Sequence, residues 1–128
     1  MATNTQPEFW LRGPVESIPP ALMPAAHAFL QTLEDVEGAT ADLSEAQLWA
    51  RPGGVASIGF HLIHLSGSTD RLLTYARGER LNDAQKAAAR AESDPPRVGA
   101  ASLLADLRRS TDAALSQLRA TDPSSLQD

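Results

Sequence analysis

Two histidines, His61 and His64, stand three residues apart in a stretch whose apolar residues recur with the period of a helix face. On a helix this spacing places the two imidazoles on neighbouring faces. One divalent metal ion could then take a ligand from this side and complete its coordination from other helices. Neutral imidazole is a good ligand for zinc, nickel, copper and iron. The pair is therefore a candidate metal site.

A structural role for both histidines stays open. Each ring could be packed and hydrogen-bonded to a backbone carbonyl, to Ser68 or to Tyr75. A His-x-x-His spacing taken alone does not decide between the two roles. Its interpretation depends on whether further ligands exist, because protein metal sites normally use at least three.

The remaining ligand types are sparse and have ordinary explanations. We expect His27 to lie on the polar face of its helix as a surface histidine. Asp70 and Asp106 are candidate ligands by helix position only. Each is read more simply as a surface charge pair, Asp70 with Arg71 and Asp106 with Arg109. Gly53 and Gly54 before a helix could offer backbone N–H groups to an anion, but a plain turn is the expected structure.

The elements that position these residues are predicted to be helices. Apolar periodicity predicts a central helix over 55–78 that is hydrophobic on nearly every side and so lies in the middle of the fold. Two further long helices are expected, one opening near Ala21 and one over about 101–119. A capping box at Ser44 predicts a short helix through Trp49, and Asn82 can cap another over about 83–92. The fold class is therefore all-α, with three long helices, two short ones and no strand.

The predicted domain organisation is simple. A proline-rich, extended N-terminal arm covers 1–20 and docks through Phe9, Trp10 and Leu11. A helical-bundle domain follows over 21–122, and a polar tail covers 123–128. A chain of 128 residues is long enough for one such domain.

Composition limits the function classes. The net charge is −5 and the eleven basic residues are scattered, which argues against a nucleic-acid partner. The absence of cysteine excludes disulfides, thiolate metal ligands and a cysteine nucleophile. No apolar run reaches the roughly 18 residues of a membrane span, and the N-terminus lacks a signal pattern. We therefore expect no membrane association and a cytoplasmic protein.

The central block resembles the DinB-like group, the damage-inducible and thiol-transferase superfamily of metal-binding helical bundles. The features that carry the resemblance are Leu-Ser-x-x-Gln-Leu-Trp, Arg-Pro-Gly-Gly, Ser-Ile-Gly, the Ile-His-Leu around His64, Asp70-Arg71-Leu72 and the segment 75–79. The Trp10-Leu11-Arg12-Gly13 arm is also similar to one bacterial branch of it. The likeness covers about residues 9–120.

The resemblance implies an up-down-down-up four-helix bundle with a nickel or zinc ion held by three histidines. One corresponds to His64, while the other two form a His-x-x-x-His pair on the fourth helix. In some relatives the metal activates a low-molecular-weight thiol for transfer or isomerisation. His61 is not a position that the family generally uses.

This sequence departs from that pattern, because no histidine follows His64. We therefore expect the fourth helix and its ligands to be missing and the metal site at His64, with His61 as accessory, to be partial or empty. An open side of the bundle would expose apolar surface, which predicts a homodimer. The function expected is metal-dependent thiol chemistry, with the enzyme question left open. The alternatives are a non-catalytic helical interaction module with structural histidines and a thiol-binding pocket without catalysis.

Overall fold

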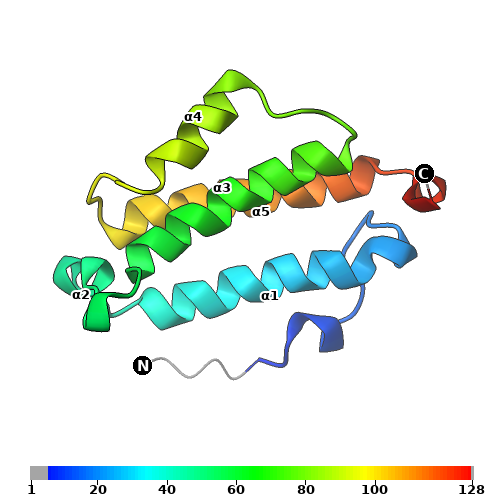
Figure 1. Cartoon of the computed structure of the whole chain (residues 1–128). Helices are drawn as coiled ribbons and strands as arrows, with labels where there is room; N and C mark the ends of the chain where they lie inside the picture. Colours follow the sequence, from blue (N-terminus) through cyan, green and yellow to red (C-terminus); the bar gives the residue numbers. More distant parts are fainter. Residues whose placement is uncertain (1–5, 128) are drawn as a thin grey trace. The chain divides into compact units, whose positions relative to one another are not determined.

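The structure is a computed structural model that describes residues 6–127, so residues 1–5 of the predicted arm and residue 128 of the predicted tail lie outside the described residues. The helices are α1 (Met23–Thr40), α2 (Glu45–Trp49), α3 (Ile58–Ala76), α4 (Asp83–Ala91) and α5 (Ala100–Ala120). Short 3-10 turns are formed by Phe9–Leu11, Pro20–Leu22, Pro52–Gly54 and Pro123–Gln127. Over the described range no strand occurs, and the predicted all-α class with three long and two short helices is confirmed (Figure 1).

The chain divides into two compact units. One comprises Met1–Ala41 with Thr111–Asp128, and the other comprises Asp42–Ser110. Helix α5 contributes its first half to the second unit and its second half to the first. No helix in the described part of the chain is both long enough and apolar enough to cross a membrane.

The first unit is built on a core of four buried apolar side chains from the N-terminal segment, α1 and α5. These are Ile18, Leu22, Ala26 and Leu115, with Val15, Met23, Leu30 and Leu118 packed against them. Ala26 is completely buried, so a larger side chain there would force its neighbours apart. Leu115 and Leu118 of α5 lie three residues apart, so both face this core from one side of the helix.

The predicted N-terminal arm contains a turn that docks on α1. The backbone N–H of Phe9 donates to Oε1 of Gln31 at 2.9 Å. Arg12 makes a bidentate ion pair with Glu34, at 2.8 and 2.9 Å, and its guanidinium lies 4.0 Å from the centre of the Phe9 ring. Trp10 and Leu11 remain 54% and 66% exposed. Docking therefore runs through Phe9 and polar contacts, and the prediction that Trp10 and Leu11 share in it is wrong.

His27 also belongs to the first unit, and its predicted surface position is wrong. The residue is buried, and its Nε2 lies 2.9 Å from the carbonyl oxygen of Gly13. Gly13 has a positive φ of 99°, a conformation that glycine adopts at little cost. The turn at Gly13 thus brings a carbonyl over α1, and the imidazole satisfies that carbonyl.

The second unit is organised around α3, with α2 near its start and α4 along its side (Figure 1). The predicted capping boxes are confirmed at both short helices: Ser44 with Gln47 opens α2, and Asn82 with Gln85 opens α4. Helix α3 begins after Ser57, whose hydroxyl accepts from the N–H of Phe60. Gly78 follows its end with a φ of +76°, as predicted for a left-handed cap.

The prediction that α3 is buried on nearly every side is wrong. Ile58, Leu72 and Tyr75 are 41%, 65% and 55% exposed. The buried residues of this helix are instead Gly59, Leu62, Thr69 and Thr74. Both threonine hydroxyls donate to carbonyls one turn earlier, at 2.7 and 2.9 Å. Burial of polar side chains is tolerated because the helix itself satisfies them, which apolar periodicity does not reveal.

Candidate functional site

His64 lies on α3 beside the end of α4, where a carboxylate meets its ring. Nδ1 of His64 is 2.9 Å from Oε2 of Glu92. The carboxylate can only accept, so Nδ1 carries the proton. No hydrogen bond to Nε2 occurs within the described range, and the His64 side chain is 50% exposed. The imidazole therefore presents its other nitrogen with its ring orientation fixed.

The same carboxylate is held by Arg71. Nη1 of Arg71 donates to Oε1 of Glu92 at 2.7 Å, and Nη2 lies 3.5 Å from Oε2. The side chains of Arg71 and Glu92 are only 16% and 9% exposed. Charge-assisted hydrogen bonds of this kind are stronger than neutral ones. Glu92 is thus fixed between a permanent cation and an imidazole.

Local sequence explains how Glu92 reaches this position. The capping box at Asn82 sets the start of α4, and Glu92 follows its last residue as the C-cap. Gln85, in the first turn of α4, donates from Nε2 to Asp70 and Thr74 of α3, at 2.9 and 2.8 Å. Helix α4 is therefore tied to α3 near both of its ends.

The ionisation of Glu92 depends on its partners. Burial by itself would raise the pKa of the Glu92 carboxyl, but the hydrogen bonds and positive charge of Arg71, with a smaller contribution from His64, outweigh it and lower the pKa below its ordinary value. The position at the C-terminal end of a helix also disfavours a negative charge. The Glu92 carboxylate stays ionised because two donors from α3, Arg71 and His64, stabilise its negative charge.

Gly67 makes room for this cluster. A Cβ atom built at this position would collide with Oε1 of Glu92 and lie 3.0 Å from Nη1 of Arg71. Glycine lowers helix propensity in the middle of a helix. Here its lack of a side chain allows the carboxylate to approach the α3 backbone.

His61 is exposed on α3 and does not join the ion-paired cluster. Its ring meets the Phe60 ring edge-on at 5.5 Å, while the His64 ring stacks on Phe60 at 5.8 Å with an interplanar angle of 5°. Within residues 6–127, no group of three His, Cys, Asp or Glu side chains is arranged to hold a metal ion. The two predicted ligands are thus brought near one phenyl ring but not to a common third ligand.

The predictions for the other candidate residues have different outcomes. Asp106 pairs with Arg109, as expected. The expected pair of Asp70 with Arg71 is wrong, because Arg71 turns to Glu92 and Asp70 accepts from Gln85. Gly53 and Gly54 form the expected turn, with φ values of +65° and +81°.

Glu92 and Arg71 are the site residues that sequence reasoning missed. One signal was present: His64 and Arg71 are seven residues apart and so share one face of α3. A basic side chain and an imidazole on one face favour a common acidic partner. Which of the acidic residues fills that role depends on where α4 packs, and local periodicity does not provide this.

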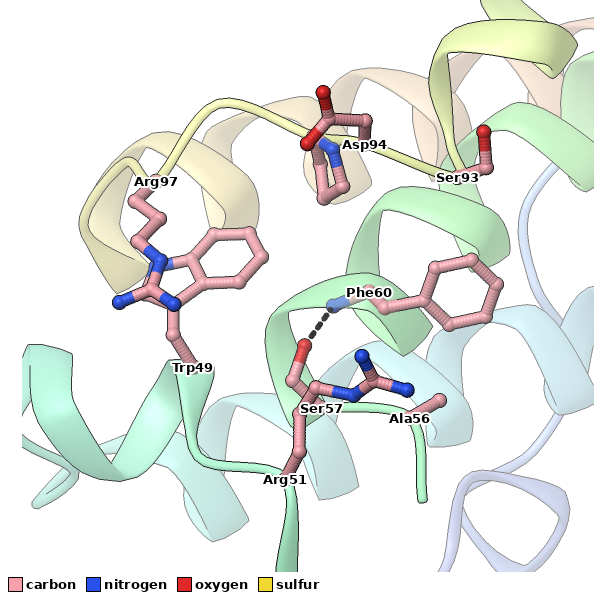
Figure 2. Close-up of a pocket in the computed structure, with 9 residues that line it drawn as sticks. Trp49, Arg51, Ala56, Ser57, Phe60, Ser93, Asp94 and Arg97 are labelled. Carbon is pink, nitrogen blue, oxygen red and sulfur yellow. Dashed lines mark hydrogen bonds between the residues drawn. The ribbon is translucent and has the colours of Figure 1, made fainter. Parts of the chain in front are cut away.

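A pocket of about 310 Å³ adjoins this cluster through Phe60, which lines the pocket and stacks on His64. Its lining comes from α2, the segment between α2 and α3, the start of α3 and the loop after α4, as Figure 2 shows for Trp49, Arg51, Phe60, Asp94 and Arg97. Nε1 of Trp49 donates to the carbonyl of Val98 at 2.9 Å, which fixes the indole. Nε and Nη2 of Arg51 donate to the carbonyls of Val55 and Gly54, at 3.2 and 3.1 Å.

Comparison with known proteins identifies one relationship. The sequence model described as DinB superfamily matches residues 28–128, which is most of the chain. No curated protein and no solved structure matches the chain. The matched range contains the whole His64, Arg71 and Glu92 cluster.

Proposed function

The chain belongs to the DinB superfamily, and from that premise we propose that it binds a divalent metal ion, nickel or zinc, through Nε2 of His64. The observation that carries the proposal is the hydrogen bond from Nδ1 of His64 to Glu92, itself held by Arg71. Metal-binding histidines usually donate their second N–H to a carboxylate or carbonyl, which fixes the tautomer and raises the basicity of the ligating nitrogen.

A complete site does not fit within the described part of one chain, since three ligands are not grouped there. We therefore propose that two copies share the metal, each contributing His64, with His61 as the accessory ligand. Both histidines are exposed, which a shared site requires. Imidazole nitrogens suit nickel and zinc alike.

The chemistry that a bound metal would supply is stabilisation of the thiolate form of a low-molecular-weight thiol, the reactant expected from the family resemblance. The chain's own part would be to hold the His64 ring, to keep Glu92 ionised through Arg71, and to fix the distance between α3 and α4. Transfer or isomerisation of the thiol adduct is the reaction class that this arrangement would serve.

A second candidate is a non-catalytic helical module in which the histidines are structural. It is favoured by the contact between His64 and Glu92, because that contact already links α3 to α4 without a metal. His27, buried against the Gly13 carbonyl, is a precedent for such a role in the same chain.

Elemental analysis of protein purified without a histidine tag distinguishes the two. After dialysis against nickel or zinc, the proposal expects about one ion for two chains, and loss of the ion in His64→Ala. The matched control is His27→Gln, which removes a histidine outside the site and keeps a side-chain N–H for the Gly13 carbonyl. A folded protein that retains no metal supports the structural module instead.

A further inference from the structure

The pocket beside Phe60 combines aromatic walls with two arginines, neither of which forms an ion pair with a carboxylate within residues 6–127. Arg51 is bonded to carbonyl oxygens, which leave its charge uncompensated. Within residues 6–127, Arg97 forms no hydrogen bond or ion pair. Two arginines thus line a pocket in which Asp94 is the one acidic residue among the lining side chains. Such a pocket favours an anion.

We propose that this pocket binds a small aromatic carboxylate. Arginine presents planar N–H donors that match a carboxylate in two parallel hydrogen bonds. Figure 2 shows Arg51 on one side of the pocket and Asp94 across from it, so that an anionic group can lie at Arg51 away from the acidic side chain. The carboxylate end of the ligand is assigned to Arg51, and Arg97 adds positive charge to the lining.

The aromatic part of the ligand is assigned to Trp49 and Phe60. Both rings line the pocket, and aromatic pairs are stabilised beyond simple area burial. The volume of about 310 Å³ is at the lower end of the roughly 300–1,000 Å³ typical of ligand pockets. A single ring with one carboxyl group suits that size better than a nucleotide or a peptide.

The site is rigid in the parts that would contact the ring. The Trp49 indole is held by the Val98 carbonyl, and Gly59 allows α3 to approach it so closely that a Cβ there would lie 2.6 Å from a ring carbon. The N-cap at Ser57 fixes the first turn of α3, which carries Phe60. A preformed pocket costs less ordering on binding.

The inference is independent of the proposed metal, so the test uses the full chain in EDTA. Sodium benzoate is titrated into the ¹⁵N-labelled protein, and amide and indole N–H shifts are followed by NMR. We expect saturable shifts that are largest at the Trp49 indole, Phe60 and Arg97. Acetate, which lacks the ring, and benzyl alcohol, which lacks the charge, should each bind at least about tenfold more weakly.

Variants locate the interaction. Arg51→Gln and Arg97→Gln should each weaken benzoate binding about tenfold or more, whereas Asp94→Asn should tighten it by removing the competing charge. Arg80→Gln is the matched control, since Arg80 is an exposed arginine of the same unit that does not line the pocket.

Any one of the following outcomes would overturn the proposal. They are the absence of saturable shifts in the wild-type protein, shifts confined to residues outside the pocket, and equal weakening by Arg80→Gln. Equal affinity for benzoate and inorganic phosphate would also contradict it, because the ring would then play no part. The wild-type shift map decides the matter even where a variant folds poorly.

Discussion

At the scale of single residues, Glu92 determines what His64 can do. A carboxylate that is nearly buried and lies just past the end of a helix is unfavourable on two counts, desolvation and the helix dipole. It is stabilised there by Arg71 at 2.7 Å and by the imidazole at 2.9 Å. The consequence for His64 is a fixed tautomer, in which Nδ1 carries the proton and Nε2 is left as the nitrogen that could bind a metal. A neutral histidine without such a partner can carry its proton on either ring nitrogen.

Replacing Glu92 with glutamine tests that dependence. Glu92→Gln keeps the size of the side chain but removes the charge that orients the imidazole, so the affinity for nickel should fall by about 10–100-fold. Isothermal titration of tag-free protein measures it. Gln85→Ala, which also weakens the contact of α4 with α3 but leaves His64 untouched, is the control. An unchanged nickel affinity in Glu92→Gln would contradict the role assigned to the carboxylate.

The lowered pKa of Glu92 makes its contribution to stability depend on pH. Because the folded pKa is below the ordinary value of 4.5, the stabilisation is fully present above that value and is lost as the pH falls through the folded pKa. Urea unfolding of the wild type and Glu92→Gln should therefore differ by about 2 kcal/mol near neutral pH. The difference should shrink as the solution is acidified below about pH 4.5. A difference that stays constant or grows with acidification would contradict this account.

At the scale of elements, sequence and structure agree wherever the determinants are local. The capping boxes at Ser44 and Asn82, the left-handed Gly78 and the extent of α5 all follow from residues within a few positions of one another. Local signals were insufficient where a side chain meets a distant segment. His27 finds a carbonyl 14 residues away, and Glu92 meets His64 at a separation of 28.

The packing of α2 on α3 gives a second example of such a distant determinant. Gly59 follows the Ser-Ile that starts α3, which the sequence marks as a helix start. Its close approach to Trp49 becomes visible only in the structure, where a Cβ would lie 2.6–2.7 Å from three carbons of the indole ring. The indole cannot shift easily, because it is buried and donates to Val98.

Gly59→Ala should therefore be destabilising although alanine is the better helix former. Overpacking costs roughly 1–3 kcal/mol, which exceeds the gain in propensity of about 1 kcal/mol at most. Gly38→Ala is the matched control: Gly38 lies in α1, and a Cβ there meets nothing within 4 Å. The control should be neutral or stabilised by about 0.5 kcal/mol. Urea unfolding compares the two variants, and stabilisation of both would show that Trp49 yields to the added methyl group.

At the scale of the whole molecule, a face of α3 that carries exposed apolar side chains, with half-buried Leu65 and Ser68 among them, is the feature that bears on assembly. Ile58, His61, Leu65, Ser68, Leu72 and Tyr75 recur at alternating intervals of three and four residues, the spacing of a seam between paired helices. Three of the apolar members are more than 40% exposed. His61 belongs to this row and His64 follows one turn later. A second copy that pairs along this face would cover apolar surface and bring further histidines to the proposed metal.

We therefore expect self-association that depends both on this row of α3 residues, called the seam below, and on the metal. The weight-average mass measured by analytical ultracentrifugation should rise from that of a single 13.6 kDa chain towards twice that value with increasing concentration. Nickel should shift the transition to lower concentration, because ligand bound only by the dimer stabilises it. Leu72→Gln should weaken association with or without nickel, whereas Leu126→Gln, an equally apolar residue that is 54% exposed in the last turn, should not.

The histidine variants separate the two contributions to association. His64→Ala should abolish the effect of nickel while leaving the concentration dependence that Leu72 supports, since the seam and the ligand act on the same equilibrium through different contacts. His27→Gln should preserve both. A mass that stays at 13.6 kDa at every concentration, with and without nickel, would contradict the shared site. A dimer that forms equally well with and without nickel would support pairing along α3 but would contradict a role for the metal in assembly.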